Sequence, residues 1–125
     1  MSAIKYFKNE LGIFRWGSVK PTKLEMDGIE GVTKNILIGL DDHAPHSIMR
    51  FFWLEPGGHS MLERHPQEHE VIVLTGKGTV RIGEEISEIK AYDVVFVSPN
   101  ELHQFNNPHD EPFGFICVIP ILEQG

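Results

Sequence analysis

Short runs of β-branched and aromatic residues, separated by turn residues, dominate the chain from residue 34 onward. Short runs rich in Val, Ile and Phe predict strands, and the Gly, Pro and Asn clusters between them predict tight turns. No stretch shows apolar residues at sustained helical spacing, so the pattern indicates an all-β barrel or sandwich. The expected strands cover residues 34–40, 47–54, 70–74, 79–82, 93–97 and 113–119.

Length and composition fit one domain of this kind. The 125 residues, with 12 glycines and 8 prolines, are enough for one core that buries about two thirds of the unfolded surface. No internal repeat, low-complexity tract or long linker divides the chain. Residues 1–125 are therefore interpreted as a single domain.

The charge of the chain argues against nucleic acid as a partner. The formal net charge is −7, and the 11 Lys and Arg residues are scattered rather than gathered in a patch that follows a phosphate backbone. Residues 1–7 are too short and too polar for a signal peptide, and no apolar run is long enough to cross a bilayer. These features predict a cytoplasmic protein without a membrane partner.

A cluster of metal-ligand residue types stands directly before the apolar run 70–74. Glu63, His65 and His69 share one parity, so an extended backbone would project them toward one face of a sheet, and His103 follows a later strand. Imidazoles with a carboxylate suit a divalent ion such as Zn, Mn, Fe, Ni or Cu. The alternative is a polar loop on the surface.

At this point the chain resembles the cupin superfamily, whose two motifs carry the metal ligands. The first motif, at about residues 58–76, falls on Gly58, Glu63, His65, His69 and Gly76. Glu63 stands where the family has its first His, and His69 stands where it has its Glu, so the set of three His and one Glu is kept with two members exchanged. Glu70 is the alternative to His69, because the family tolerates a spacer of three or four residues.

The second motif, at about residues 92–107, falls on Tyr92, Ser98, Asn100, His103 and Asn107. Tyr92, Ser98 and Asn100 replace the usual Gly, Pro and Gly. Asn100 can still serve a turn, since Asn adopts positive φ more readily than most residues. The two motifs and their surroundings cover residues 48–120, more than half of the chain.

The resemblance implies a cupin-type β-barrel, also called a jelly roll or double-stranded β-helix, of the small oxalate decarboxylase-like group. It implies a metal centre on Glu63, His65, His69 and His103, with Mn, Fe or Zn favoured and Ni or Cu possible. It also implies a homodimer, for which the alternating apolar residues of 36–40 offer a partner surface.

The pocket beside such a metal should be lined by side chains of the inward parity. Phe105 is expected there because it lies two residues from His103. In the run 49–53, either Met49, Phe51 and Trp53 or Arg50 and Phe52 face inward. An inward Arg50 would offer a bidentate partner to a carboxylate ligand. Cys117, the only cysteine, is interpreted as a small buried apolar side chain, with a place in the pocket wall as the alternative.

These observations predict a metal-dependent enzyme for a small oxygen-rich metabolite, such as a dicarboxylate, keto acid or sugar acid. The reaction types that fit are decarboxylation, dioxygenation and isomerisation. The alternatives are a non-catalytic binding or sensing module for a small molecule, and a relic with weak metal binding. They are favoured by the lack of an identifiable general acid or base, because Glu101 beside His103 reads as a turn residue.

Overall fold

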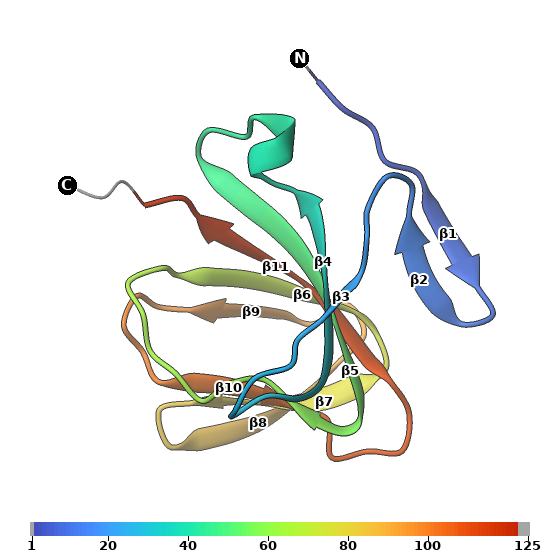
Figure 1. Ribbon diagram of the computed structural model, residues 1–125. Helices are drawn as coiled ribbons and strands as arrows, with labels where there is room; N and C mark the ends of the chain where they lie inside the picture. Colours follow the sequence, from blue (N-terminus) through green and yellow to red (C-terminus); the bar gives the residue numbers. More distant parts are fainter. Residues whose placement is uncertain (1, 123–125) are drawn as a thin grey trace.

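Nine strands form one antiparallel sheet that curls into a barrel in the computed structural model, which describes residues 2–122 (Figure 1). The strands are β3 (Thr22–Lys23), β4 (Glu30–Ile38), β5 (Ser47–His59), β6 (His69–Thr75), β7 (Lys77–Ile82), β8 (Glu85–Lys90), β9 (Val94–Val97), β10 (His103–Asn106) and β11 (Phe113–Pro120). Their main order is β8-β7-β10-β5-β11-β6-β9, with β4 on β5 and β3 on β4. The predicted all-β barrel is confirmed.

The long strand β5 joins the two parts of this sheet. It pairs with β11 along residues 47–54, with β4 on its other side, and at His59 with Asn106 of β10. A positive φ of 80° at Gly57 bends the strand, and the amide of Gly57 donates to the carbonyl of Asn107. Asn107 closes the second motif by donating from Nδ2 to the carbonyls of Leu54 and Glu111. The motif therefore ends in a fully bonded buried amide.

The core fills the inside of the barrel with aromatic and branched side chains. Phe105 and Phe115 stack with ring centroids 4.5 Å apart, and Phe113 lies against Phe115 at 5.2 Å. Burial of such side chains is the main stabilising term, at roughly 1.5–3 kcal/mol each. The buried cluster comprises Val32, Leu54, Val71, Val73, Val80, Ile89, Phe105, Phe113, Phe115 and Cys117.

An N-terminal hairpin, which the apolar pattern did not predict, lies outside the barrel (Figure 1). Its strands β1 (Phe7–Glu10) and β2 (Ile13–Trp16) pair only with each other. Phe14 and Trp16 pack on Phe51 of β5 with ring centroids 5.7 and 5.0 Å away. The hairpin therefore covers part of the outer face of the barrel. A 3-10 turn, η1 (Leu40–Asp42), also overlaps the predicted loop between β4 and β5.

Three turns show why the motif positions favour residues that tolerate positive φ. Gly76, between β6 and β7, has φ 72°, and a Cβ there would come within 2.1 Å of the carbonyl oxygen of Pro112. Tyr92 and Asn100, which replace two motif glycines, have φ values of 74° and 64°. The backbone of the motif is thus kept while the residues differ, at a steric cost for Tyr92.

The apolar residues of 36–40 alternate as expected along the edge of the sheet. Ile36, Ile38 and Leu40 are 47%, 42% and 68% exposed, whereas Leu37 is buried. They leave an exposed apolar strip, and the homodimer stays a prediction. Among the described residues, no helix is long and apolar enough to span a bilayer.

Tyr92→Gly should stabilise the protein. The positive φ costs a non-glycine residue about 1–2 kcal/mol, and glycine loses about 0.5–1 kcal/mol through the greater freedom of the unfolded chain. Because the Tyr92 side chain is 76% exposed, the net gain should be about 0.5–1 kcal/mol. Urea unfolding measures it, with Tyr92→Ala as the control that keeps a Cβ. A Gly variant no more stable than the Ala variant would contradict the steric account.

Candidate metal centre

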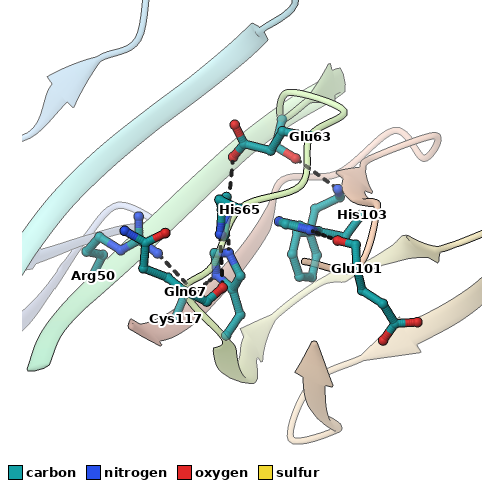
Figure 2. A network of polar contacts seen from close by, with 10 residues as sticks. Arg50, Glu63, His65, Gln67, Glu101, His103 and Cys117 are labelled. Carbon is teal, nitrogen blue, oxygen red and sulfur yellow. Dashed lines mark hydrogen bonds and ion pairs between the residues drawn. The ribbon is translucent and has the colours of Figure 1, made fainter. Parts of the chain in front are cut away.

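Three histidines from separate segments come together, and two of them, His65 and His103, are labelled in Figure 2. His65 lies in the loop before β6, His69 begins β6, and His103 begins β10. Their ring centroids are 4.7 to 4.9 Å apart. One ring nitrogen from each lies within 4.8 Å of the other two. We call this group the histidine cluster.

Backbone pairing of the loop 60–68 with β10 brings the cluster together. The amide of Ser60 donates to the carbonyl of Phe105, and Glu63 and His103 exchange two backbone hydrogen bonds of 3.1 and 2.9 Å. The loop then bends at residues 66–67 before β6 starts. His65 and His69 therefore meet through a bend, and the continuous extended backbone assumed in the parity argument is wrong here.

Two histidines are oriented by backbone carbonyls. Nδ1 of His65 lies 2.9 Å from the carbonyl oxygen of Gln67, and Nδ1 of His103 lies 2.8 Å from that of Glu101. A carbonyl oxygen only accepts, so each Nδ1 carries a proton, and in the neutral ring Nε2 is then the nitrogen with the lone pair. This is the arrangement in which metal-binding histidines are held by their other ring nitrogen. It also gives Glu101 a role through its backbone, while its exposed side chain takes no part in these contacts.

The His69 side chain is buried, at 7% exposed, and so is that of His103, at 3%. Burial, followed by the positive charges of His103, Arg50 and His65, lowers the pKa of His69 to about 3. Its Nδ1 lies 2.7 Å from the sulfur of Cys117. The imidazole therefore stays neutral at ordinary pH, which is the form that binds a metal.

The donor set fits a divalent transition metal. Nε2 of His69 lies 2.9 Å from Nε2 of His65. That distance suits a hydrogen bond when one nitrogen carries a proton, and it also suits two nitrogens bound to one ion at about 2.1 Å each. In the second case Nδ1 of His69 carries the proton and donates a hydrogen bond to the sulfur of Cys117. Three neutral imidazoles can hold Mn, Fe, Zn, Ni or Cu.

The two candidate carboxylates differ in their relation to the cluster. One oxygen of Glu63 lies 3.6 Å from Nε2 of His65, and its side chain is 44% exposed. Glu63 is therefore adjacent to the cluster of three without being a member of it. Glu70 is exposed on β6 opposite Phe96 and Val118, away from the pocket lining.

A cavity of about 210 Å³ opens onto the cluster. His69, His103 and Glu63 line one part of it, and Arg50 and Lys34 line another. The remaining wall is mainly apolar and includes Leu24, Met26, Ile29, Val32, Phe52, Leu54, Met61, Phe105, Phe115 and Cys117. The site is thus a small, mostly apolar pocket with few polar groups, as is usual for small-molecule sites.

The cavity lining shows which face of β5 points inward. Arg50 and Phe52 line the cavity, as do Phe105, which was expected there, and Cys117, for which the pocket wall was the alternative. Phe51 and Trp53 do not: they face outward beneath the N-terminal hairpin, where Phe14 lies 6.1 Å from Trp53. Of the two alternatives for this strand, the one that places Phe51 and Trp53 in the pocket wall is therefore wrong, because both lie on the other face, beneath the hairpin.

Cys117 links the cluster to Arg50. Its sulfur accepts a hydrogen bond of 3.2 Å from Nη2 of Arg50 (Figure 2) and also lies 2.7 Å from Nδ1 of His69. Burial raises the pKa of this thiol, with Arg50 acting in the other direction. The protonated thiol therefore positions its two neighbours and is no ready nucleophile.

Several contributors gave no sequence signal. Gln67 and Glu101 act through backbone carbonyls, which any residue type could supply. Lys34 lines the cavity, although nothing in its sequence setting distinguishes it from the scattered surface lysines. His59 stands apart, with Nδ1 near the carbonyl of Ser60.

Acid should destabilise the metal-free protein through His69. The folded-state pKa of about 3 lies below the ordinary 6.5, so between these values the unfolded chain binds a proton that the folded chain does not. The contribution is fully present above pH 6.5 and is lost progressively as the pH falls toward 3. Urea unfolding of chelator-treated protein at several pH values in this interval should show the loss, with a shallower slope for His69→Gln. If the free energy of unfolding falls equally steeply with pH in the parent and in His69→Gln, the role of His69 in acid destabilisation is contradicted.

Solved structures share this architecture. A cupin 2 conserved barrel domain protein from Rhodopseudomonas palustris has a TM-score of 0.83 and 28% identity, covering 98% of this chain and 83% of its own. A predicted oxalate decarboxylase from Thermotoga maritima has a TM-score of 0.75 and 26% identity, covering 84% of this chain and 95% of its own.

Sequence comparison gives the same result at higher identity. The 1-methylthio-D-xylulose 5-phosphate methylsulfurylase of Rhodospirillum rubrum is 34% identical over 109 residues, which cover 85% of this chain and 69% of that enzyme. The cupin domain profile matches residues 50–119, more than half of the 125 residues. On this match and these relatives, the chain belongs to the cupin family.

Proposed function

We propose that this protein is a metal-dependent enzyme that acts on a small, oxygen-rich metabolite. The observation that carries the proposal is the histidine cluster, whose ring nitrogens converge beside a cavity of about 210 Å³. Sites for drug-sized ligands have about 300–1,000 Å³, so this cavity suits a smaller molecule. A dicarboxylate, a keto acid or a sugar acid has the size and the oxygens required.

His65, His69 and His103 would hold the metal through their Nε2 atoms, with Nδ1 of each committed to a fixed partner. When bound, a divalent ion supplies a Lewis acid that polarises a substrate oxygen. The apolar wall, including Phe52 and Phe105, excludes water from the reacting end of the substrate. Exclusion of water strengthens the electrostatic interactions made there.

Glu63 is the carboxylate closest to this chemistry. Of the described residues that line the cavity, it is the only Asp or Glu. Its distance of 3.6 Å from Nε2 of His65 and its partial exposure allow a small rotation toward the site. We assign it as the fourth ligand, with proton exchange at its carboxylate as the second role open to it.

The relatives support an enzyme over a passive binding protein. One is named as a methylsulfurylase of 1-methylthio-D-xylulose 5-phosphate, and another as a predicted oxalate decarboxylase. Both names describe chemistry on small, oxygen-rich carbon compounds. The second candidate, a non-catalytic binding or sensing module, is favoured by the single carboxylate in the cavity.

Turnover assays distinguish these two candidates. Protein loaded with Mn, Fe or Zn would be screened with small dicarboxylates, keto acids, sugar acids and sugar phosphates for CO₂ release, O₂ uptake or isomerised product. Metal-dependent turnover of one compound supports the enzyme. Saturable binding without turnover across the screen would support the binding module.

Loss of one histidine should remove the metal. His65→Ala and His103→Ala each leave two imidazoles, and an incomplete, hydrated site binds a divalent ion far more weakly. Elemental analysis after dialysis should show stoichiometric metal in the parent and almost none in either variant. Glu70→Gln is the control, because Glu70 points away from the cavity. Full metal content in the double variant His65→Ala/His103→Ala would refute the assignment.

Glu63 should determine metal preference. A carboxylate oxygen favours harder ions such as Mn and Fe, whereas an imidazole at that place favours softer ones. Glu63→His should therefore retain metal but shift competition between Mn and Cu toward Cu, and Glu63→Ala should weaken Mn binding about 10-fold or more, the typical cost of a lost supporting group. Competitive loading followed by elemental analysis measures both. If Glu63→Ala binds Mn as tightly as the parent, Glu63 is not a ligand and the site has three protein ligands.

A further inference from the structure

Arg50 is a cation inside the cavity whose hydrogen-bonding capacity is mostly unused. Its guanidinium stacks on Phe52, with Cζ 4.8 Å from the ring centroid, and Nη2 donates to the sulfur of Cys117. Nε is buried and has no hydrogen-bond partner. Sulfur is a weak acceptor, so five strong N–H donors meet one weak partner.

No acidic side chain neutralises this charge. Among the described residues, ion pairs within 4.0 Å involve neither Arg50 nor Lys34. A partly buried guanidinium without an anion or a strong acceptor is costly, and proteins normally pair such groups. Within a chain of net charge −7, two unpaired cations in one small cavity call for a partner from outside the chain.

Lys34 lies on the same wall as Arg50. In the register of β4 and β5, Lys34 is opposite Phe52 and Ile36 is opposite Arg50. Lys34 and Arg50 are thus diagonal neighbours, which on one face of a sheet lie about 7–8 Å apart. Both line the cavity that His69 and His103 also line. An oxyanion between the two cations would therefore share the cavity with the histidine cluster.

We propose that Arg50 and Lys34 form an oxyanion subsite that binds the carboxylate or phosphate group of the substrate, while the rest of the substrate faces the histidine cluster. The inference rests on the proposed function, since it takes the cavity as the substrate site. Arg50 supplies the planar fork that matches two oxygens of one anion, and Phe52 and Cys117 hold the fork in place. Lys34 supplies a second, mobile charge.

The experiment measures anion binding without metal, so it does not depend on turnover. Chelator-treated full-length protein is titrated with inorganic phosphate or glycolate at constant ionic strength, and binding is followed by NMR chemical shifts. Phosphate and glycolate distinguish the two anion sources, because the tighter one identifies the group the subsite prefers. The parent should bind at least one of them saturably, with shifts at Arg50 and its neighbours.

Arg50→Gln should weaken this binding about 10-fold or more, the usual effect of losing hydrogen bonds to a charged group. Lys34→Gln should weaken it less, and Lys77→Gln, the same charge change at an exposed residue outside the cavity, should have no effect. Arg50→Lys keeps the charge without the fork and should also bind more weakly. If Arg50→Gln does not fold, the anion affinity of Arg50→Lys is the test of the subsite.

Two results would overturn the subsite: no saturable binding by the parent, or parental affinity in the Arg50 variants. Elemental analysis of the same proteins separates this inference from the proposed function. Arg50-dependent anion binding in a protein that takes up no metal would leave the subsite standing and refute the metal enzyme. Metal uptake without Arg50-dependent binding would overturn the subsite alone.

Discussion

The site depends on the backbone pairing of Glu63 with His103. Two hydrogen bonds between these residues fix the loop 60–68 against the start of β10. His65 lies in no regular strand, and its own carbonyl accepts a hydrogen bond of 2.8 Å from the amide of Asn100, which adds a second backbone contact to this loop. The carbonyls of Gln67 and Glu101 then set the orientation of the two rings. Main-chain geometry thus places the side chains that carry the chemistry.

The cavity combines two opposing electrostatic elements in an apolar setting. Imidazole nitrogens of the histidine cluster lie at one side, and the charges of Arg50 and Lys34 lie on the wall formed by β4 and β5. Cys117 connects the two, since its sulfur contacts both His69 and Arg50. A low-polarity cavity strengthens each of these interactions relative to water. Under the proposed function, this arrangement would suit a small molecule that carries both metal-binding oxygens and an anionic group.

Much of the fold was predictable from the sequence because barrel strands alternate and turn residues separate them. The strands from β4 to β9 and β11 match the apolar runs to within a few residues, apart from β8. The hairpin β1–β2 was missed because its four-residue strands carry mostly exposed side chains and are stabilised by tertiary contacts of Phe14 and Trp16. The periodicity of apolar residues within these two strands could not predict that Phe14 and Trp16 pack on Phe51 of β5.

The candidate site was predictable in residue type and less so in geometry. The spacing of the two motifs selected His65, His69 and His103, which the structure brings together. Parity could not tell which face of β5 points inward, since Phe51 and Arg50 both sit in apolar surroundings; the hairpin decides it. The residue pattern could not predict the roles of the Gln67 and Glu101 carbonyls or the inward position of Lys34.

The central claim is that the three Nε2 atoms converge on one divalent ion. X-ray absorption spectroscopy of the Mn(II)-loaded protein tests this directly, because imidazole rings give a characteristic multiple-scattering pattern beyond the nearest shell. The account predicts a nearest shell of nitrogen and oxygen with the scattering of three imidazoles. A shell of oxygen alone, without imidazole scattering, would contradict it.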